Sequence, residues 1–72
     1  MKKIKKIKIK VNGRVKSIND NYSILDLVKN LEIPIKKVAI ELNQEIIDKK
    51  KISKINLKKN DKIEIVYFIG GG

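Results

Sequence analysis

The sequence predicts an α+β fold in which a mixed sheet of four to five strands packs against one main helix. Three observations predict this fold class. Apolar residues alternate with lysines near the N-terminus, a stripe at helical spacing follows, and a second alternating run lies near the C-terminus. A chain of 72 residues has room for one modest core. A single helix crossing one face of a small sheet suits that length.

The first two strands are predicted to form a hairpin. Isoleucine and valine alternate with lysine over residues 7–11, which is the pattern of a half-buried strand. Asn12-Gly13 follows, and both residues tolerate the positive φ angles of a type I′ turn. Residues 15–18 then form the returning strand. We interpret Asn12-Gly13 as a tight turn and nothing more.

The helix is predicted to begin at Ser23. Its hydroxyl can cap the first turn, and Asp26, three residues later, completes a capping-box pattern. Pro34 prevents the helix from continuing much beyond Glu32. The apolar residues at positions i, i+3, i+4 and i+7 are predicted to form one buried stripe: Ile24, Leu27, Val28 and Leu31.

The remaining strands are predicted over residues 38–42, 45–47 and 62–68. A loop over residues 49–59, with a helical turn near residues 52–54, connects the last two. The element order is therefore strand, strand, helix, strand, strand, strand. With the first and last strands parallel at the centre of the sheet, this order is the β-grasp, or ubiquitin-like, architecture.

Residues 1–69 are predicted to form the folded domain, and residues 70–72 a flexible glycine tail. Because glycine has no Cβ, Gly70, Gly71 and Gly72 can thread a channel too narrow for other residues. The α-carboxylate of Gly72 is ionised at neutral pH and is a poor electrophile until something such as ATP activates it. The tail therefore predicts a protein whose own terminus is the reactive group, the alternative being an ordinary frayed chain end.

Composition argues against independent catalysis. The chain has neither cysteine nor histidine, which removes thiol nucleophiles, the commonest metal ligands and the usual general base. We therefore predict no catalytic residue, no metal site and no bound cofactor. No apolar stretch is long enough to span a membrane, and no signal-peptide core follows the N-terminal lysines, so a cytoplasmic protein is expected.

The formal net charge of +10 suggests nucleic-acid binding at first sight. However, Arg14 is the sole arginine, and arginine is favoured for bidentate phosphate recognition. Aromatic residues make up only 4% of the chain, so platforms for base stacking are scarce. Nucleic acid is therefore not a predicted partner, and the lysines are interpreted as a solvated surface.

The last strand is predicted to present a docking surface. Its isoleucines face the core, whereas Glu64 lies on the opposite face, which should be open to solvent. Val66 and Phe68 share the face of Glu64 and would be exposed apolar groups directly before the tail. The alternative is that the loop over residues 49–59 covers them. Tyr67 is expected to pack at the strand end with its hydroxyl at the rim.

The sequence resembles the ThiS family of sulfur-carrier proteins, which serve thiazole synthesis for thiamine. The resemblance covers nearly the whole chain. It rests on Val11-Asn12-Gly13, on residues 38–47, and on Asp61 to Val66 running into Gly70-Gly71-Gly72. Family members often have Gly-Asp before the last strand, where this chain has Asn60-Asp61, and asparagine also tolerates left-handed geometry.

The resemblance implies a mechanism. A partner adenylyltransferase would use Mg-ATP to convert the Gly72 carboxylate into an acyl-adenylate, and a persulfide donor would displace AMP to leave a Gly72 thiocarboxylate. Thiazole synthase would then take the sulfur. By the same resemblance, Gly70 and Gly71 thread into the partners, and Val66 and Phe68 lie on the docking face.

The sequence alone leaves other functional hypotheses open. The small subunit of molybdopterin synthase uses the same terminal chemistry, and a ubiquitin-like modifier would form an isopeptide bond through Gly72. An RNA-binding β-grasp module would explain the lysines but has no use for a glycine terminus. An unmodified structural subunit ranks last.

Overall fold

The computed structural model describes residues 5–68, which form a five-stranded sheet, one α-helix and two short 3-10 helices. The strands are β1 (Lys6–Val11), β2 (Arg14–Asn19), β3 (Val38–Leu42), β4 (Glu45–Ile46) and β5 (Lys62–Tyr67). The helices are α1 (Ile24–Asn30), η1 (Ile35–Lys37) and η2 (Lys49–Lys51).

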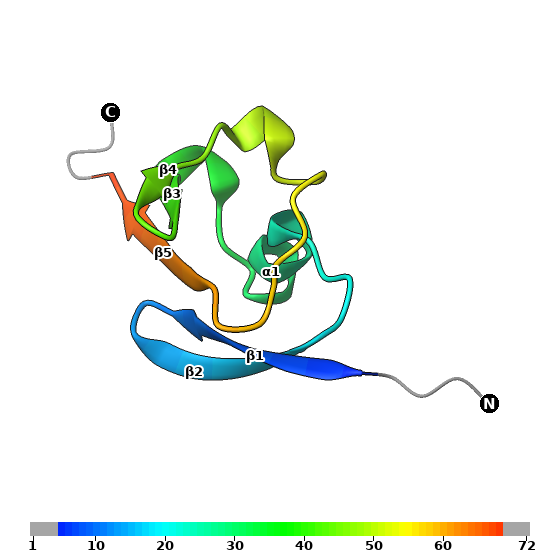
Figure 1. The fold of residues 1–72 in the computed structure, drawn as a ribbon. Helices are drawn as coiled ribbons and strands as arrows, with labels where there is room; N and C mark the ends of the chain where they lie inside the picture. Colours follow the sequence, from blue (N-terminus) through cyan, green and yellow to red (C-terminus); the bar gives the residue numbers. More distant parts are fainter. Residues whose placement is uncertain (1–4, 69–72) are drawn as a thin grey trace.

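The sheet has the strand order β2-β1-β5-β3-β4, with α1 lying across one face (Figure 1). β1 and β5 pair in parallel, while the other neighbouring strands are antiparallel. The first and last strands are thus neighbours in the middle of the sheet. This arrangement confirms the predicted α+β fold and the β-grasp topology.

Both hairpins turn at residues with positive φ. Asn12 and Gly13 have φ angles of 49° and 82° between β1 and β2. Asn43 and Gln44 have φ angles of 51° and 73° between β3 and β4. Positive φ at both central residues is what a type I′ turn requires, and its twist matches that of the flanking strands. Asn60 also adopts a positive φ, 71°, as expected for a turn before β5.

The start of α1 confirms the predicted capping box. The Ser23 hydroxyl accepts a hydrogen bond from the Asp26 N–H at 3.0 Å, and the Asp26 carboxylate accepts one from the Ser23 N–H at 2.9 Å. Ile24, Leu27 and Val28 of the stripe are buried. Leu31 is not: it is the C-cap residue and is 37% exposed. The helix ends sooner than its apolar spacing suggests, because the chain turns left-handed at Glu32, where φ is 56°.

Replacing Ser23 by alanine should lower stability. The hydroxyl is in a residue only 7% exposed, so the Asp26 N–H loses its partner where water does not readily replace it. We expect a loss of about 1 kcal/mol, or about 4–8 °C in the melting temperature of so small a domain. Thermal denaturation followed by circular dichroism measures it. Ser53→Ala, at an exposed turn, is the matched control, and an equal effect of both changes would refute the capping role.

The core lies between the helix and the inner face of the sheet. Its members come from every long element and from the loop after η2. The packing of the core therefore depends on all of these segments. The buried apolar residues are Ile9, Ile18, Ile24, Leu27, Val28, Val38, Ile40, Ile52, Leu57, Ile63 and Ile65.

Several predicted boundaries shift by a residue or more. β2 is one residue longer at each end than expected, and β4 and β5 each end one residue earlier. The helical turn expected at residues 52–54 lies instead at η2, because the Asp48 side chain accepts a hydrogen bond from the Lys50 N–H at 2.9 Å and so caps the turn there. Across residues 5–68, no helix is long and apolar enough to cross a membrane.

Candidate functional site

The C-terminal end of β5 exposes three consecutive large apolar side chains. Val66 is 52% exposed, Tyr67 54% and Phe68 56%. The exposure of Val66 and Phe68 is as the strand pattern predicted, while their role in docking stays a prediction. The expectation that Tyr67 packs was wrong. Its cross-strand partner Val38 is fully buried, but Tyr67 is the last residue of β5 and does not belong to the core.

The part of the loop after β4 that holds Ile52 and Ile55 does not cover this surface. Ile52 is 4% exposed and belongs to the core beneath the helix. The carbonyls of Ile52 and Ile55 accept hydrogen bonds from the N–H groups of Leu25 and Ile24, which ties the loop to the start of α1. Val66 and Phe68 therefore stay about half exposed, although Lys49 at the start of this loop reaches the Phe68 ring. We call these two side chains the docking pair.

The chain is held firmly where it leaves the sheet. The Phe68 N–H donates to the Lys37 carbonyl at 2.9 Å, which continues the pairing between β5 and the segment before β3. The Lys49 ammonium lies 5.0 Å from the centroid of the Phe68 ring and donates to the Ile35 carbonyl at 2.9 Å. A cation at this distance from an aromatic face is attracted to it. The position of Phe68 is thus set by both its backbone and its ring.

The predicted reactive residue Gly72 and the predicted threading residues Gly70 and Gly71 lie outside residues 5–68. In sequence they follow the docking pair closely, since only Ile69 separates Phe68 from Gly70. The site as described therefore consists of the surface from which the tail departs.

Sequence reasoning missed the second role of Asn12. Its side-chain Oδ1 accepts a hydrogen bond from the Ile65 N–H at 2.7 Å, and its Nδ2 donates to the Ile65 carbonyl at 3.2 Å. The backbone N–H of Asn12 also donates to the Ile63 carbonyl at 2.9 Å. The amide thus acts like one further peptide of β1 and extends the parallel pairing along β5. We call this contact the Asn12 clamp.

Asn43 makes a comparable contact from the other side of β5. Its Oδ1 accepts from the Lys62 N–H at 2.9 Å, and its own N–H donates to the Lys62 carbonyl at 2.7 Å. The two turn asparagines therefore hold β5 from both neighbouring hairpins. No sequence signal separates this role from turn formation, because positive φ alone already accounts for asparagine at both positions.

Comparison with known proteins places this chain in one family. The model of the ThiS family matches residues 9–72. The sulfur carrier protein ThiS of Bacillus subtilis is 40% identical over 65 residues, which cover 89% of this chain and 98% of that protein. The crystal structure of the thiamine biosynthesis protein ThiS from Geobacter metallireducens superimposes with a TM-score of 0.78 at 26% identity. It covers 92% of this chain and all of that one.

A second kind of relative is much longer. The thiazole synthase of Paramagnetospirillum magneticum is 35% identical over 66 residues, and that of Magnetococcus marinus 32%. These matches cover 92% of this chain but only 20% of each thiazole synthase. Family model, carrier and solved structure agree over nearly the full length, and the chain belongs to the ThiS family.

Proposed function

We propose that the Gly72 carboxylate of this chain carries sulfur for thiazole formation in thiamine biosynthesis. The observation that carries the proposal is the match to the ThiS family, which extends through residue 72 and so includes the glycines. The B. subtilis relative is itself a sulfur carrier protein. In this role the chain is a protein co-substrate and not a catalyst. Its fold supplies a surface for docking and a fixed point of departure for the tail.

The chemistry at Gly72 proceeds by activation and displacement. A carboxylate oxygen attacks the α-phosphorus of ATP, pyrophosphate leaves, and the acyl-adenylate forms; Mg²⁺ on the partner balances the phosphate charge. The terminal sulfur of a donor persulfide attacks the acyl carbon. The bond from this carbon to the AMP oxygen breaks, and AMP leaves with the electron pair. The resulting acyl disulfide is cleaved by a thiol, which becomes oxidised to a disulfide. The thiocarboxylate remains on Gly72, ready to give its sulfur to thiazole synthase.

The partners follow from this chemistry. Thiazole synthase is supported by the two longer relatives, in which a region like this chain is part of a protein of that name. Linking a carrier to its acceptor raises their effective concentration, so such a fusion is advantageous where the two must meet. The adenylyltransferase and the persulfide donor are proposed because a carboxylate needs both activation and a sulfur source. The need for ATP favours a cytoplasmic location.

Intact mass spectrometry tests the proposal. The untagged protein is incubated with its adenylyltransferase, Mg-ATP, a persulfide donor and a thiol. We expect an oxygen-to-sulfur mass gain that fragmentation localises to Gly72, and loss of that gain when thiazole synthase and its other substrates are added. An unchanged mass would refute the proposal, provided that the same adenylyltransferase modifies a known carrier in a control reaction.

Replacing both members of the docking pair by serine should weaken partner binding without unfolding the domain. Val66 and Phe68 are about half exposed, so their removal costs little stability, whereas an apolar group at the centre of an interface contributes strongly to affinity. We expect Val66→Ser/Phe68→Ser to raise the half-saturating concentration about tenfold in thiocarboxylate formation, with the maximal rate nearly unchanged. Leu31→Ser, at the end of the helix, is the control. Wild-type kinetics in the double variant would exclude this docking surface.

A further inference from the structure

The outer face of the sheet, opposite α1, carries a row of lysines. Lys8 and Lys10 alternate with Ile9 on β1, and Lys62 on β5 lies directly opposite Lys10. All three side chains are exposed. Neighbours on one face are about 7 Å apart along a strand and about 5 Å apart between strands. We call these three residues the lysine row.

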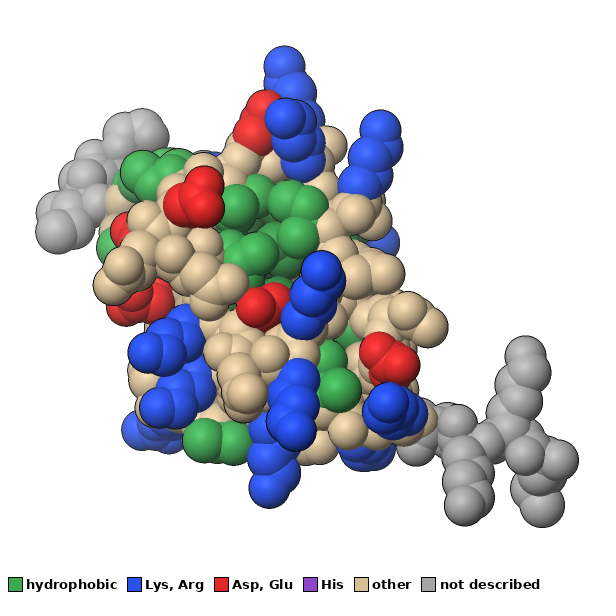
Figure 2. Space-filling view, viewed as in Figure 1, with side chains coloured by type: hydrophobic (Ala, Val, Ile, Leu, Met, Phe, Trp, Pro, Cys, Tyr) green, Lys and Arg blue, Asp and Glu red, His purple; other side chains and the backbone are tan. Residues whose placement is uncertain are grey.

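The other half of the same face is acidic. Glu64 on β5 lies directly opposite Glu41 on β3. Figure 2 shows Lys and Arg side chains around the whole molecule with acidic side chains among them, so the separation of charge is a feature of these strand pairs and not of the entire surface. Like charges placed directly opposite each other destabilise a sheet. Folding therefore does not favour either the Lys10–Lys62 pair or the Glu41–Glu64 pair, and both point to a use outside the folded chain.

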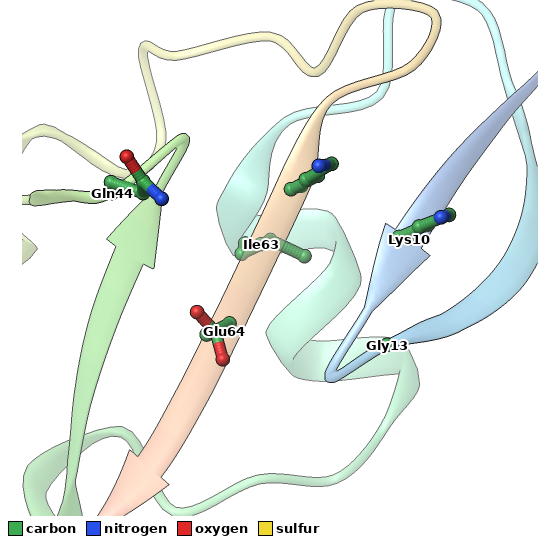
Figure 3. Close-up of a pocket in the computed structure, with 6 residues that line it drawn as sticks. Lys10, Gly13, Gln44, Ile63 and Glu64 are labelled. Atoms are coloured by element: carbon green, nitrogen blue, oxygen red, sulfur yellow. The ribbon is translucent and has the colours of Figure 1, made fainter.

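A shallow groove of about 330 Å³ marks the boundary between the two halves (Figure 3). Lys10 of the first hairpin and Gln44 of the turn after β3 lie on either side of it, and Lys62 and Glu64 of β5 lie between them. Glu64 is also two residues from Val66 along β5 and on the same face. The lysine row, the groove and the docking pair therefore form one continuous surface with a basic end and an apolar end.

We propose that thiazole synthase docks across this whole face, with acidic side chains against the lysine row and an apolar surface against the docking pair. This inference rests on the proposed function and adds the chemistry of the partner's surface. Two rows of opposite sign allow one orientation and penalise the reversed one through like-charge contacts. In the allowed orientation, β5 runs from the basic end towards the apolar end, so the partner's acceptor site must lie beyond the docking pair.

Charge reversal on β1 tests the inference. In Lys8→Glu/Lys10→Glu, one new carboxylate faces Lys62, so the repulsion across the sheet is relieved and the melting temperature should not fall. Binding to thiazole synthase should weaken about tenfold in low salt, about 50 mM, and by less in about 500 mM salt, where charges are screened. The control Lys29→Glu/Lys54→Glu makes the same change in net charge at exposed positions on the helix side, and should stay within about twofold of wild type.

The outcomes separate cleanly. The inference is supported if only Lys8→Glu/Lys10→Glu binds more weakly than the wild type, and if this difference disappears in high salt. Equal weakening of both double variants would show an effect of net charge only, and wild-type binding by the β1 variant would show that the lysine row is solvated surface; either result overturns it. Weaker binding to the adenylyltransferase alone would overturn the choice of partner. Failure of the wild type to form the thiocarboxylate would instead reject the proposed function, so the two failures are distinguishable.

Discussion

Replacing Gly71 by valine is expected to abolish thiocarboxylate formation at Gly72 while leaving the domain folded. The proposed chemistry needs the Gly72 carboxylate to reach ATP inside the adenylyltransferase, and a β-branched side chain one residue earlier widens the segment that must pass. A displacement of about 1 Å at a reacting centre can cost about a hundredfold in rate. We therefore expect a loss of at least about a hundredfold, measured as the rate of mass gain by intact mass spectrometry.

A graded series makes this prediction specific. Gly71→Ala adds only a methyl group and should retain more activity than Gly71→Val, and removal of Gly71 and Gly72 should leave none. All three variants should melt at the wild-type temperature, because they leave the core and the strand pairs of residues 5–68 unchanged. Full activity of Gly71→Val would show that the tail does not thread a narrow channel. Its inactivity together with a lowered melting temperature would point to folding instead.

Much of the fold follows from periodicity and turn chemistry. The alternation over β1 and β5, the capping box at Ser23 and the turn residues Asn12 and Asn43 each specify a local structure, and together they leave few topologies for so short a chain. The exposure of the docking pair also follows from alternation, since Glu64 fixes which face of β5 is open.

Features that depend on where elements end, or on contacts between distant residues, could not be predicted. Leu31 fits the apolar stripe, but whether it packs depends on the left-handed turn at Glu32 one residue later. Tyr67 has the parity of the core face, yet the core ends at Val38 opposite it. The lysine row needs the register of β1 against β5, because Lys10 and Lys62 are 52 positions apart in sequence and adjacent only in the sheet.

The Asn12 clamp is also a contact between residues distant in the sequence. Its removal should cause the largest loss of stability among the variants proposed for this chain. Asn12→Gly keeps the turn, because glycine favours the positive φ that Asn12 adopts at 49°. It removes both side-chain hydrogen bonds to Ile65, a residue only 5% exposed. The Ile65 N–H and carbonyl then lose partners that water cannot fully replace.

We expect Asn12→Gly to lower the free energy of unfolding by about 2 kcal/mol, since each net hydrogen bond contributes about 1 kcal/mol and unsatisfied groups add more. Asn12→Ala should cost about 1 kcal/mol beyond that, because alanine is also strained at positive φ. Urea denaturation measures both losses. Hydrogen exchange at the Ile65 amide should accelerate in each variant, because that amide donates to the lost oxygen.

Asn21→Gly is the matched control for this pair. Asn21 also has a positive φ, 62°, but the hydrogen bond at its position is made by its backbone N–H to Asp20, which glycine keeps. It should therefore change stability by a few tenths of a kcal/mol at most. If Asn12→Gly were equally mild, the amide would be a turn residue alone. A large loss at Asn12 with unchanged stability at Asn21 would mean that one side chain in the first hairpin holds β5, the strand that precedes the proposed sulfur-carrying residues in the sequence.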